Sequence, residues 1–255
     1  MSDDNAPGFY GKLPALGDFV TRRLPRAFVE PWDQWLQLAI TASRAQMKGD
    51  WLPAYLSGPI WRFALAPGVC GQSAWAGALM PSVDKVGRYF PLTMAAKHAR
   101  NPFAAICGAA DCAGWFDRVE ETLLFTLGDG AADVQSFDVQ AQTLTPCWSL
   151  DASPTLPSVT AFEEASGWSI PATPAVTEAA ALLLAHLVHE RLDSPSIWWT
   201  KGSERIESGL LVCQGLPSPD RFAGMLDARW RTHPSTAVEA SETDTQAEPP
   251  LDIPA

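Results

Sequence analysis

The sequence predicts one α/β domain: a mixed, largely antiparallel β-sheet flanked by helices, in a layered αβα sandwich. Short apolar runs bounded by Pro or Gly alternate with longer segments of helical periodicity, and neighbouring runs suit hairpins. Hydrophobic residues make up 47% of the 255, enough for a sizeable core. We expect a folded unit over 8–231, a flexible N-terminus over 1–7 and an acidic, disordered tail over 232–255.

Four segments have apolar residues at helical spacing. Pro31 suits the first turn of the first segment, and Ser218 and Pro219 suit the cap and first turn of the last. The third is apolar nearly all round, which predicts a buried helix. The predicted helices span 31 to about 49, 112–128, 173–192 and 218–230.

Short apolar runs predict the strands, with the first two paired and the last two paired. They cover 59–68, 74–82, 90–99, 194–202 and 207–217. Residues 133–144 alternate between apolar and polar, which favours an extended piece. The segment 146–174 holds five prolines, which predicts a loop. Its two tryptophans should hold this loop against the domain.

The formal net charge of −11 argues against nucleic-acid and anionic-membrane binding. Five of the negative charges follow Arg231, in the tail. No apolar run is long enough to span a membrane, and the first residues lack the pattern of a secretory signal. Five scattered cysteines are expected to be reduced thiols, so we expect a cytoplasmic protein.

Motifs for catalysis fail on the residues that would perform the chemistry. Gly11-Lys12 is followed by Leu13 where a phosphate-binding loop needs Ser or Thr. Around Val69–Gly77, the position of a papain-like nucleophile holds Ala74, and Ser73 lacks the second glycine of a hydrolase elbow. We therefore expect no catalytic residue, no cofactor and no small-molecule substrate.

Two histidines leave an enzymatic alternative open. His186 and His189 are three residues apart on a predicted helix, with Glu190 next to them. Zinc hydrolases place a carboxylate between two such histidines, and no third ligand is evident here, so two histidines on a helix surface are the simpler interpretation. A metal-dependent or Ser/Cys hydrolase stays as the alternative.

The residues most suited to binding a partner lie in two stretches. Residues 8–25, GFYGKLPALGDFVTRRLP, predict a stiff, basic surface loop with Gly8, Gly11 and Gly17 as hinge points. Residues 80–92, MPSVDKVGRYFPL, predict a turn that an Asp84–Arg88 pair holds or that presents Arg88. Trp198 and Trp199 should point to opposite faces of a strand, one into the core and the other either under a helix or as an exposed anchor.

These stretches, with WDQWL, SGPIWRFALAPG and PSIWW, resemble the TagF (ImpM) family of type VI secretion over about residues 8–231. The resemblance implies a cytoplasmic, non-enzymatic repressor that acts after translation by binding the forkhead-associated scaffold protein of the apparatus. A structural subunit of the apparatus is a further alternative. From the length, we expect no appended phosphatase domain of the kind that some relatives carry.

From the residues and the resemblance together, we expect two sets of functional positions. The expected partner-binding residues are Lys12, Leu13, Pro14, Asp18, Phe19, Arg22, Arg23, Asp84, Arg88 and Trp199. The expected structural residues of the family motifs are Gly8, Gly11, Gly17, Trp61, Trp75, Pro81, Ser82, Gly87, Phe90, Pro91 and Trp198.

Overall fold

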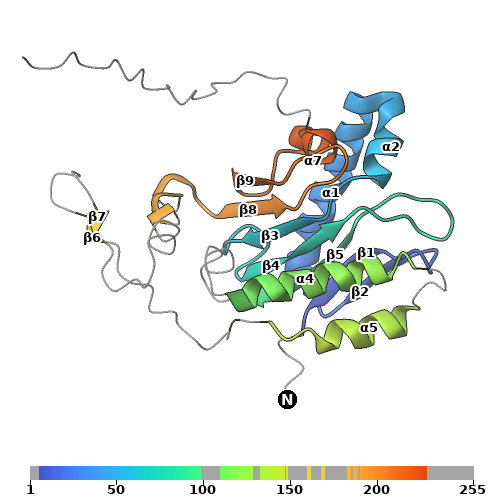
Figure 1. Cartoon of the computed structure of the whole chain (residues 1–255), viewed down its shortest axis with the longest axis horizontal. Coiled ribbons are helices and arrows are strands. Elements are labelled where there is room, and N and C mark those ends of the chain that lie inside the picture. Colours follow the sequence, from blue (N-terminus) through green and yellow to red (C-terminus); the bar gives the residue numbers. More distant parts are fainter. Residues whose placement is uncertain are drawn as a thin grey trace, which may run out of the picture.

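A seven-stranded sheet forms the centre of the protein, seen here in a computed structural model (Figure 1). The structure describes residues 6–98, 110–128, 133–146, 148, 160–161, 168–169, 183–184, 186–188 and 190–228. Residues 1–5 of the predicted N-terminus 1–7, and the whole of the predicted tail 232–255, lie outside these residues.

The sheet has the strand order β2-β1-β5-β4-β3-β8-β9, and each neighbouring pair is antiparallel. The strands are β1 (Gly8–Lys12), β2 (Phe19–Arg22), β3 (Trp61–Leu65), β4 (Ala74–Met80), β5 (Leu92–His98), β8 (Pro195–Thr200) and β9 (Gly209–Gln214). A separate pair joins β6 (Thr160–Ala161) to β7 (Trp168–Ser169). The predicted hairpin pairing of β3 with β4, and of β8 with β9, is confirmed.

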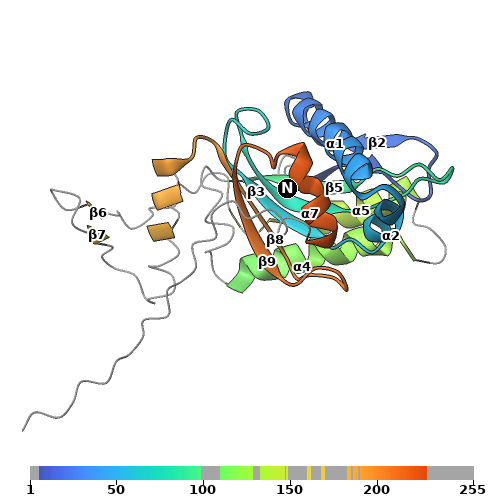
Figure 2. The same ribbon diagram turned by 90° about the horizontal axis from the view of Figure 1, so that it is seen from above.

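One face of the sheet is covered by α1 (Arg26–Met47), α2 (Trp51–Leu56) and α7 (Phe222–Asp227), with the short helices η2 (Lys48–Asp50) and η4 (Pro219–Arg221) between them (Figure 2). Aromatic residues dominate the core on this side. Trp32 of α1 stacks on Trp198 of β8, with ring centroids 5.7 Å apart, and its indole donates a hydrogen bond to Thr93. Trp198 is fully buried, as predicted.

The opposite face is covered by α4 (Ala110–Phe125) and α5 (Val134–Thr143) (Figures 1 and 2). Small residues of β4, such as Ala76 and Ala78, face the large buried rings of Trp115 and Phe116 on α4. Phe9 of β1 meets Phe137 of α5 edge to face at 4.7 Å. The sheet therefore separates two hydrophobic cores, which confirms the layered α/β architecture.

Two of the predicted elements differ from the structure. Helix α1 begins at Arg26, so Pro31 lies inside the helix rather than in its first turn. Segment 133–144 is helix α5, not an extended piece, because Asp133 caps its first turn by accepting a hydrogen bond from the Ser136 amide. Burial of Phe137 and Ala141, four residues apart, gives the segment a helical apolar face.

The helix predicted over 173–192 is described in part. Its described residues are half-buried or exposed, and Leu184 is 50% exposed, so the expectation of a helix buried all round is wrong there. Most of the proline-rich segment lies outside the described residues. Trp148 does pack against the domain, because its indole donates to the Lys97 carbonyl and its ring contacts Trp115.

The opening stretch is not a surface loop. Residues 8–12 form the buried strand β1, second from the sheet edge, and residues 19–22 form β2 beside it. Gly8 and Gly11 are therefore not hinges: a Cβ on Gly11, whose φ is +137°, would lie 2.0 Å from the Pro91 carbonyl oxygen. Close backbone packing explains the glycines.

Within the described residues, no helix is both long and apolar enough to cross a membrane.

Candidate functional site

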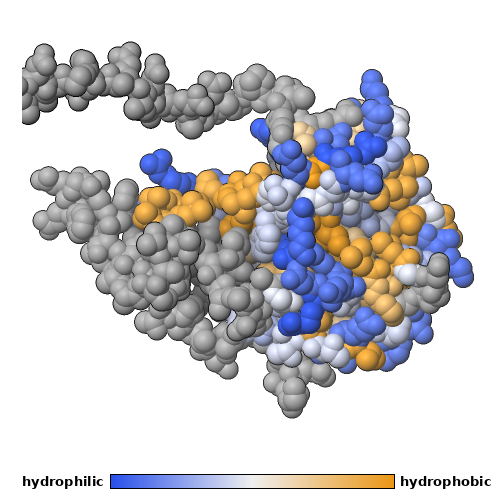
Figure 3. All heavy atoms as spheres, viewed as in Figure 1, coloured by the Kyte–Doolittle hydropathy of each residue, from blue (hydrophilic) through white to orange (hydrophobic). Residues whose placement is uncertain are grey.

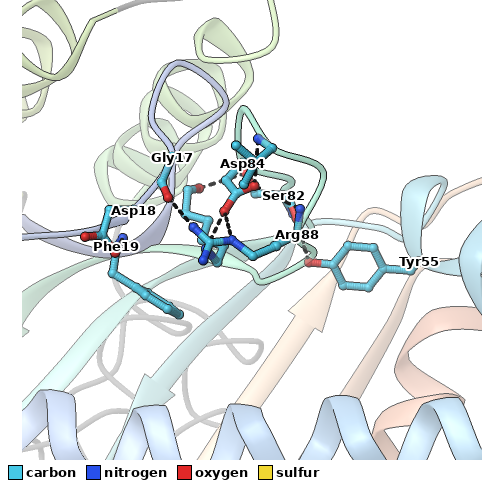
Figure 4. Close-up of polar contacts among 9 residues, drawn as sticks. Gly17, Asp18, Phe19, Tyr55, Ser82, Asp84 and Arg88 are labelled. Carbon is cyan, nitrogen blue, oxygen red and sulfur yellow. Dashed lines mark hydrogen bonds and ion pairs between the residues drawn. The ribbon is translucent and has the colours of Figure 1, made fainter.

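Two turns meet at one end of the sheet, and we call them the paired turns. The first, residues 13–18, joins β1 to β2, and the second, residues 81–91, joins β4 to β5. The Lys85 amide donates to the Leu16 carbonyl, and the Arg88 guanidinium donates to the Gly17 carbonyl (Figure 4). Segments 70 residues apart in sequence thus form one surface feature.

A buried ion pair lies beneath the paired turns. Lys12 Nζ lies 2.5 Å from Asp84 Oδ2, and Lys12 and Asp84 are 4% exposed each. The other carboxylate oxygen of Asp84 accepts hydrogen bonds from the amides of Val86 and Arg88. Burial alone would raise the pKa of Asp84, but the hydrogen bonds from Lys12, Arg88 and the amides outweigh it and hold that pKa well below its usual value.

Arg88 binds the same carboxylate from the solvent side. Its Nε lies 2.7 Å from Asp84 Oδ2, while its side chain is 56% exposed. The predicted Asp84–Arg88 pair is therefore present in the structure. Since the pair uses only part of the guanidinium, Arg88 braces the turn and still presents a charge to solvent.

Ser82 and Tyr55 connect the paired turns to α2. Ser82 Oγ donates to the Lys12 carbonyl, and the Tyr55 hydroxyl both donates to the Ser82 carbonyl and accepts from the Ser82 amide (Figure 4). Tyr55 was not predicted, because a tyrosine on a short helix has no distinguishing sequence signal. Gly87, with φ of +82°, allows the second turn to close.

The outer surface of the paired turns combines apolar and charged groups. Val86 is 66% exposed and Phe19 is 43% exposed, although Phe19 also packs on Phe90 and lies under Lys12 Nζ. Asp18 is exposed, and its carboxylate accepts a hydrogen bond from the Phe19 amide. Val86 was not predicted as a surface residue of the site; its signal in the sequence is an apolar residue inside a polar turn.

The last turn of α4 lies at the same end of the molecule as the paired turns (Figures 1 and 2). Three large apolar residues in this turn or directly after it are about half exposed: Leu124, Phe125 and Leu127. Figure 3 shows hydrophobic residues gathered toward this end of the face that α4 covers. The region around the paired turns is thus more apolar than a purely solvated loop would be.

Three of the expected partner-binding residues are not accessible. Lys12, Leu13 and Asp84 are at most 4% exposed, so the expectation that they present a surface is wrong. The physical reason is that β1 is an inner strand, which turns Lys12 into the internal counter-ion of Asp84. Pro14 is half-buried in the first of the paired turns.

The remaining expected binding residues lie elsewhere. Arg22 is exposed on the edge strand β2. Arg23 binds Asp138 of α5 at 2.5 Å, which ties the chain after β2 to that helix. Trp199 is half-buried against Phe116, with ring centroids 4.8 Å apart, so it is not the exposed anchor that was one expectation.

Most of the expected structural residues are packed inside the fold. The indoles of Trp61 and Trp75 donate to the carbonyls of Met225 and Cys70. Phe90 and Pro91 are buried, Pro81 is half-buried, and Gly17 is exposed with open space around it.

A second polar cluster lies on the face of the sheet under α4. Arg62 of β3 binds Asp117 and Glu120 of α4 at 2.6 Å each, and Lys201 contacts the same two carboxylates at 2.7 and 3.0 Å. Four charges thus pair with one another and fasten α4 to the sheet. No acid or base in this cluster lacks a partner.

Some of the groups that the hydrolase alternative would use lie in the described part of the chain. No cluster of three or more His, Cys, Asp or Glu residues suited to a metal occurs there. His186 contacts Glu190 at 3.2 Å, and His189 lies outside the described residues. Burial raises the pKa of the Cys70 thiol to about 12 and that of Cys213 to about 11, which disfavours the reactive thiolate.

The fold and the paired turns define an α/β domain with a seven-stranded antiparallel sheet and a rigid, partly apolar surface at one end. Comparison with protein families matches residues 8–144 to the TagF N-terminal domain, described as type VI secretion system-associated. The chain therefore belongs to the TagF family, as its motifs predicted. Comparison with curated proteins found no significant match.

A solved structure is similar over most of the chain. It is the crystal structure of PA0076 from Pseudomonas aeruginosa PAO1, at 40% sequence identity and a TM-score of 0.70. The similarity covers 88% of this chain and 94% of that one. The sheet and its helical layers are thus shared along nearly the whole of PA0076.

Proposed function

We propose that this protein is a cytoplasmic, non-enzymatic repressor of a type VI secretion system, and that it acts by binding the forkhead-associated scaffold protein of the apparatus. The observation that carries the proposal is that the paired turns are held by buried contacts and expose residues suited to binding. A buried Lys12–Asp84 pair holds them from inside, while Val86 and Arg88 stay exposed outside.

Rigid presentation favours binding because a loop that is already ordered loses little entropy when a partner docks. Four hydrogen bonds or ion pairs converge on the Asp84 carboxylate, and two more cross between the turns, from Arg88 to the Gly17 carbonyl and from Lys85 to the Leu16 carbonyl. Arginines and aromatic residues are also the residue types most often found at the energetic centre of interfaces. Arg88 and Phe19 supply both types here.

The polar clusters of the described residues support a binding role over hydrolysis. The buried acids Asp84 and Glu120 are each paired with cations, so neither is a free general base. The two described thiols have raised pKa values. A hydrolase would need a different set of groups.

Deleting the gene tests the regulatory role. Loss of a repressor raises secretion by the apparatus, whereas loss of a structural subunit abolishes it. Wild-type protein should restore low secretion in the deletion strain, and the double variant Val86→Asp, Arg88→Glu should not, at equal protein level. Secretion that falls on deletion would refute the proposed repression.

A further inference from the structure

The two edges of the sheet differ in how they are protected. β2 has four residues and is flanked by charged side chains, Asp18 before it and Arg22 and Arg23 at its end. Short strands and charges are the usual devices that stop a sheet edge from pairing with another chain. β9 has six residues, GLLVCQ, with no charge and no proline.

β9 is also accessible. Its residues are half-buried or exposed, and Leu210 is 57% exposed. In the described part of the chain, β9 pairs only with β8 and is the last strand of the sheet. An edge strand carries a row of backbone donors and acceptors that a further strand can use.

A cavity of about 480 Å³ lies beside the first half of β9. Trp61, Ile206 and Leu211 give it apolar walls, and the exposed Arg205 and Arg221 line it too. Glu207 contributes one negative charge, which leaves the lining with a net positive charge. A strand added to β9 would place every second side chain on the cavity side of the sheet.

We propose that β9 and this cavity, together the β9 edge, bind an extended, acidic segment of a partner protein as an eighth strand. Backbone hydrogen bonds to β9 would supply affinity. An apolar side chain in the cavity, flanked by acids facing Arg205 and Arg221, would supply specificity.

Charge favours a partner over pairing of β9 with the β9 strand of a second copy. β9 has no acidic residue, so such a pair would leave Arg205 and Arg221 without a counter-charge from the added strand, and two chains of formal charge −11 repel each other. The β9 edge does not include the paired turns, so its occupant is additional to the proposed scaffold contact.

The test measures binding of an end-blocked, fluorescent ten-residue peptide in which valine and leucine alternate with glutamate and serine. One control peptide has lysine in place of glutamate, and a second is N-methylated at alternate residues so that it cannot pair with a strand. The protein is the full chain, as wild type and as the double variant Arg205→Glu, Arg221→Glu. Arg118→Glu, an exposed arginine on α4, is the matched control.

We expect wild type and Arg118→Glu to bind the acidic peptide at least tenfold more tightly than either control peptide. The double variant should lose at least tenfold in affinity, whereas Arg88→Glu should change nothing. The proposal would be overturned if the acidic peptide showed no saturable binding to wild type. It would also be overturned if the N-methylated peptide bound as tightly as the acidic peptide, or if the double variant bound the acidic peptide as tightly as wild type. Sedimentation as a dimer without peptide binding would overturn it too, and would assign the edge to a second copy. If wild-type protein binds the acidic peptide at the β9 edge but does not bind the scaffold protein, that result would count against the proposed function alone.

Discussion

Replacing Lys12 or Arg88 separates the internal role of the Asp84 cluster from its surface role. Both cations lie on the same carboxylate oxygen, at 2.5 and 2.7 Å. The Lys12 side chain is 5% exposed and that of Arg88 is 56% exposed. Lys12→Met and Arg88→Met keep most of each side chain's length but remove its charge and its N–H donors.

The expected cost follows from exposure. Removing one partner of a buried ion pair destabilises a protein by about 3–5 kcal/mol when the other charge is left uncompensated. Because Arg88 and two amides still contact Asp84, we expect Lys12→Met to lower the free energy of unfolding by about 2–3 kcal/mol. An exposed pair contributes about 0–1 kcal/mol, which sets the expectation for Arg88→Met.

Urea denaturation, followed by tryptophan fluorescence, measures both variants. The m-value should stay unchanged, so that the shift in midpoint reports stability. Equal effects of Lys12→Met and Arg88→Met, or a loss below about 0.5 kcal/mol for Lys12→Met, would refute the reasoning that the buried cation organises the paired turns.

Three further predictions follow from the packing. Gly11→Ala should prevent stable folding, since its Cβ would lie 2.0 Å from a backbone carbonyl oxygen. Gly17→Ala, whose Cβ would have no atom nearer than 3.9 Å, should leave the circular dichroism spectrum and the melting temperature unchanged. In urea denaturation, Arg62→Met should lower the free energy of unfolding by about 2–4 kcal/mol, because the Arg62 side chain is buried. Lys201→Met should lower it by less than about 1 kcal/mol, because the Lys201 side chain is 64% exposed. Because the pKa of Asp84 is lowered by folding, its contribution is present above the unfolded pKa of about 4 and is lost as pH falls below it. The stability gap between wild type and Asp84→Asn should therefore narrow in urea titrations below pH 4.

The sequence was informative wherever apolar periodicity was strong. The strands Trp61–Leu65 and Ala74–Met80 end at Pro or Gly, and their short connection leaves an antiparallel hairpin as the simple solution. The prediction of an extended piece over residues 133–144 was wrong because, over so short a stretch, apolar residues can fit both an alternating and a helical pattern. The N-cap from Asp133 favours the helix over the extended conformation. That cap is hard to recognise in the sequence, because aspartate is equally common in turns.

The opening stretch shows why the site was harder to predict than the fold. Glycine, proline and basic residues indicate an exposed loop on average, but Lys12 faces Asp84, 72 residues later. A partner so distant in sequence cannot be inferred from local pattern. The glycines signalled close backbone approach across β1 rather than hinges, and only the strand order reveals this.

The affinity of this protein for the forkhead-associated scaffold protein, measured by calorimetry, tests the central claim most directly. The informative variant is Val86→Asp, Arg88→Glu in the paired turns. Its matched control is Leu38→Asp, Arg118→Glu, which changes an exposed apolar residue and an exposed arginine elsewhere on the surface. We predict that the paired-turn variant binds at least tenfold more weakly than wild type while the control binds equally well. Equal affinity of the folded paired-turn variant and wild type would contradict the claim.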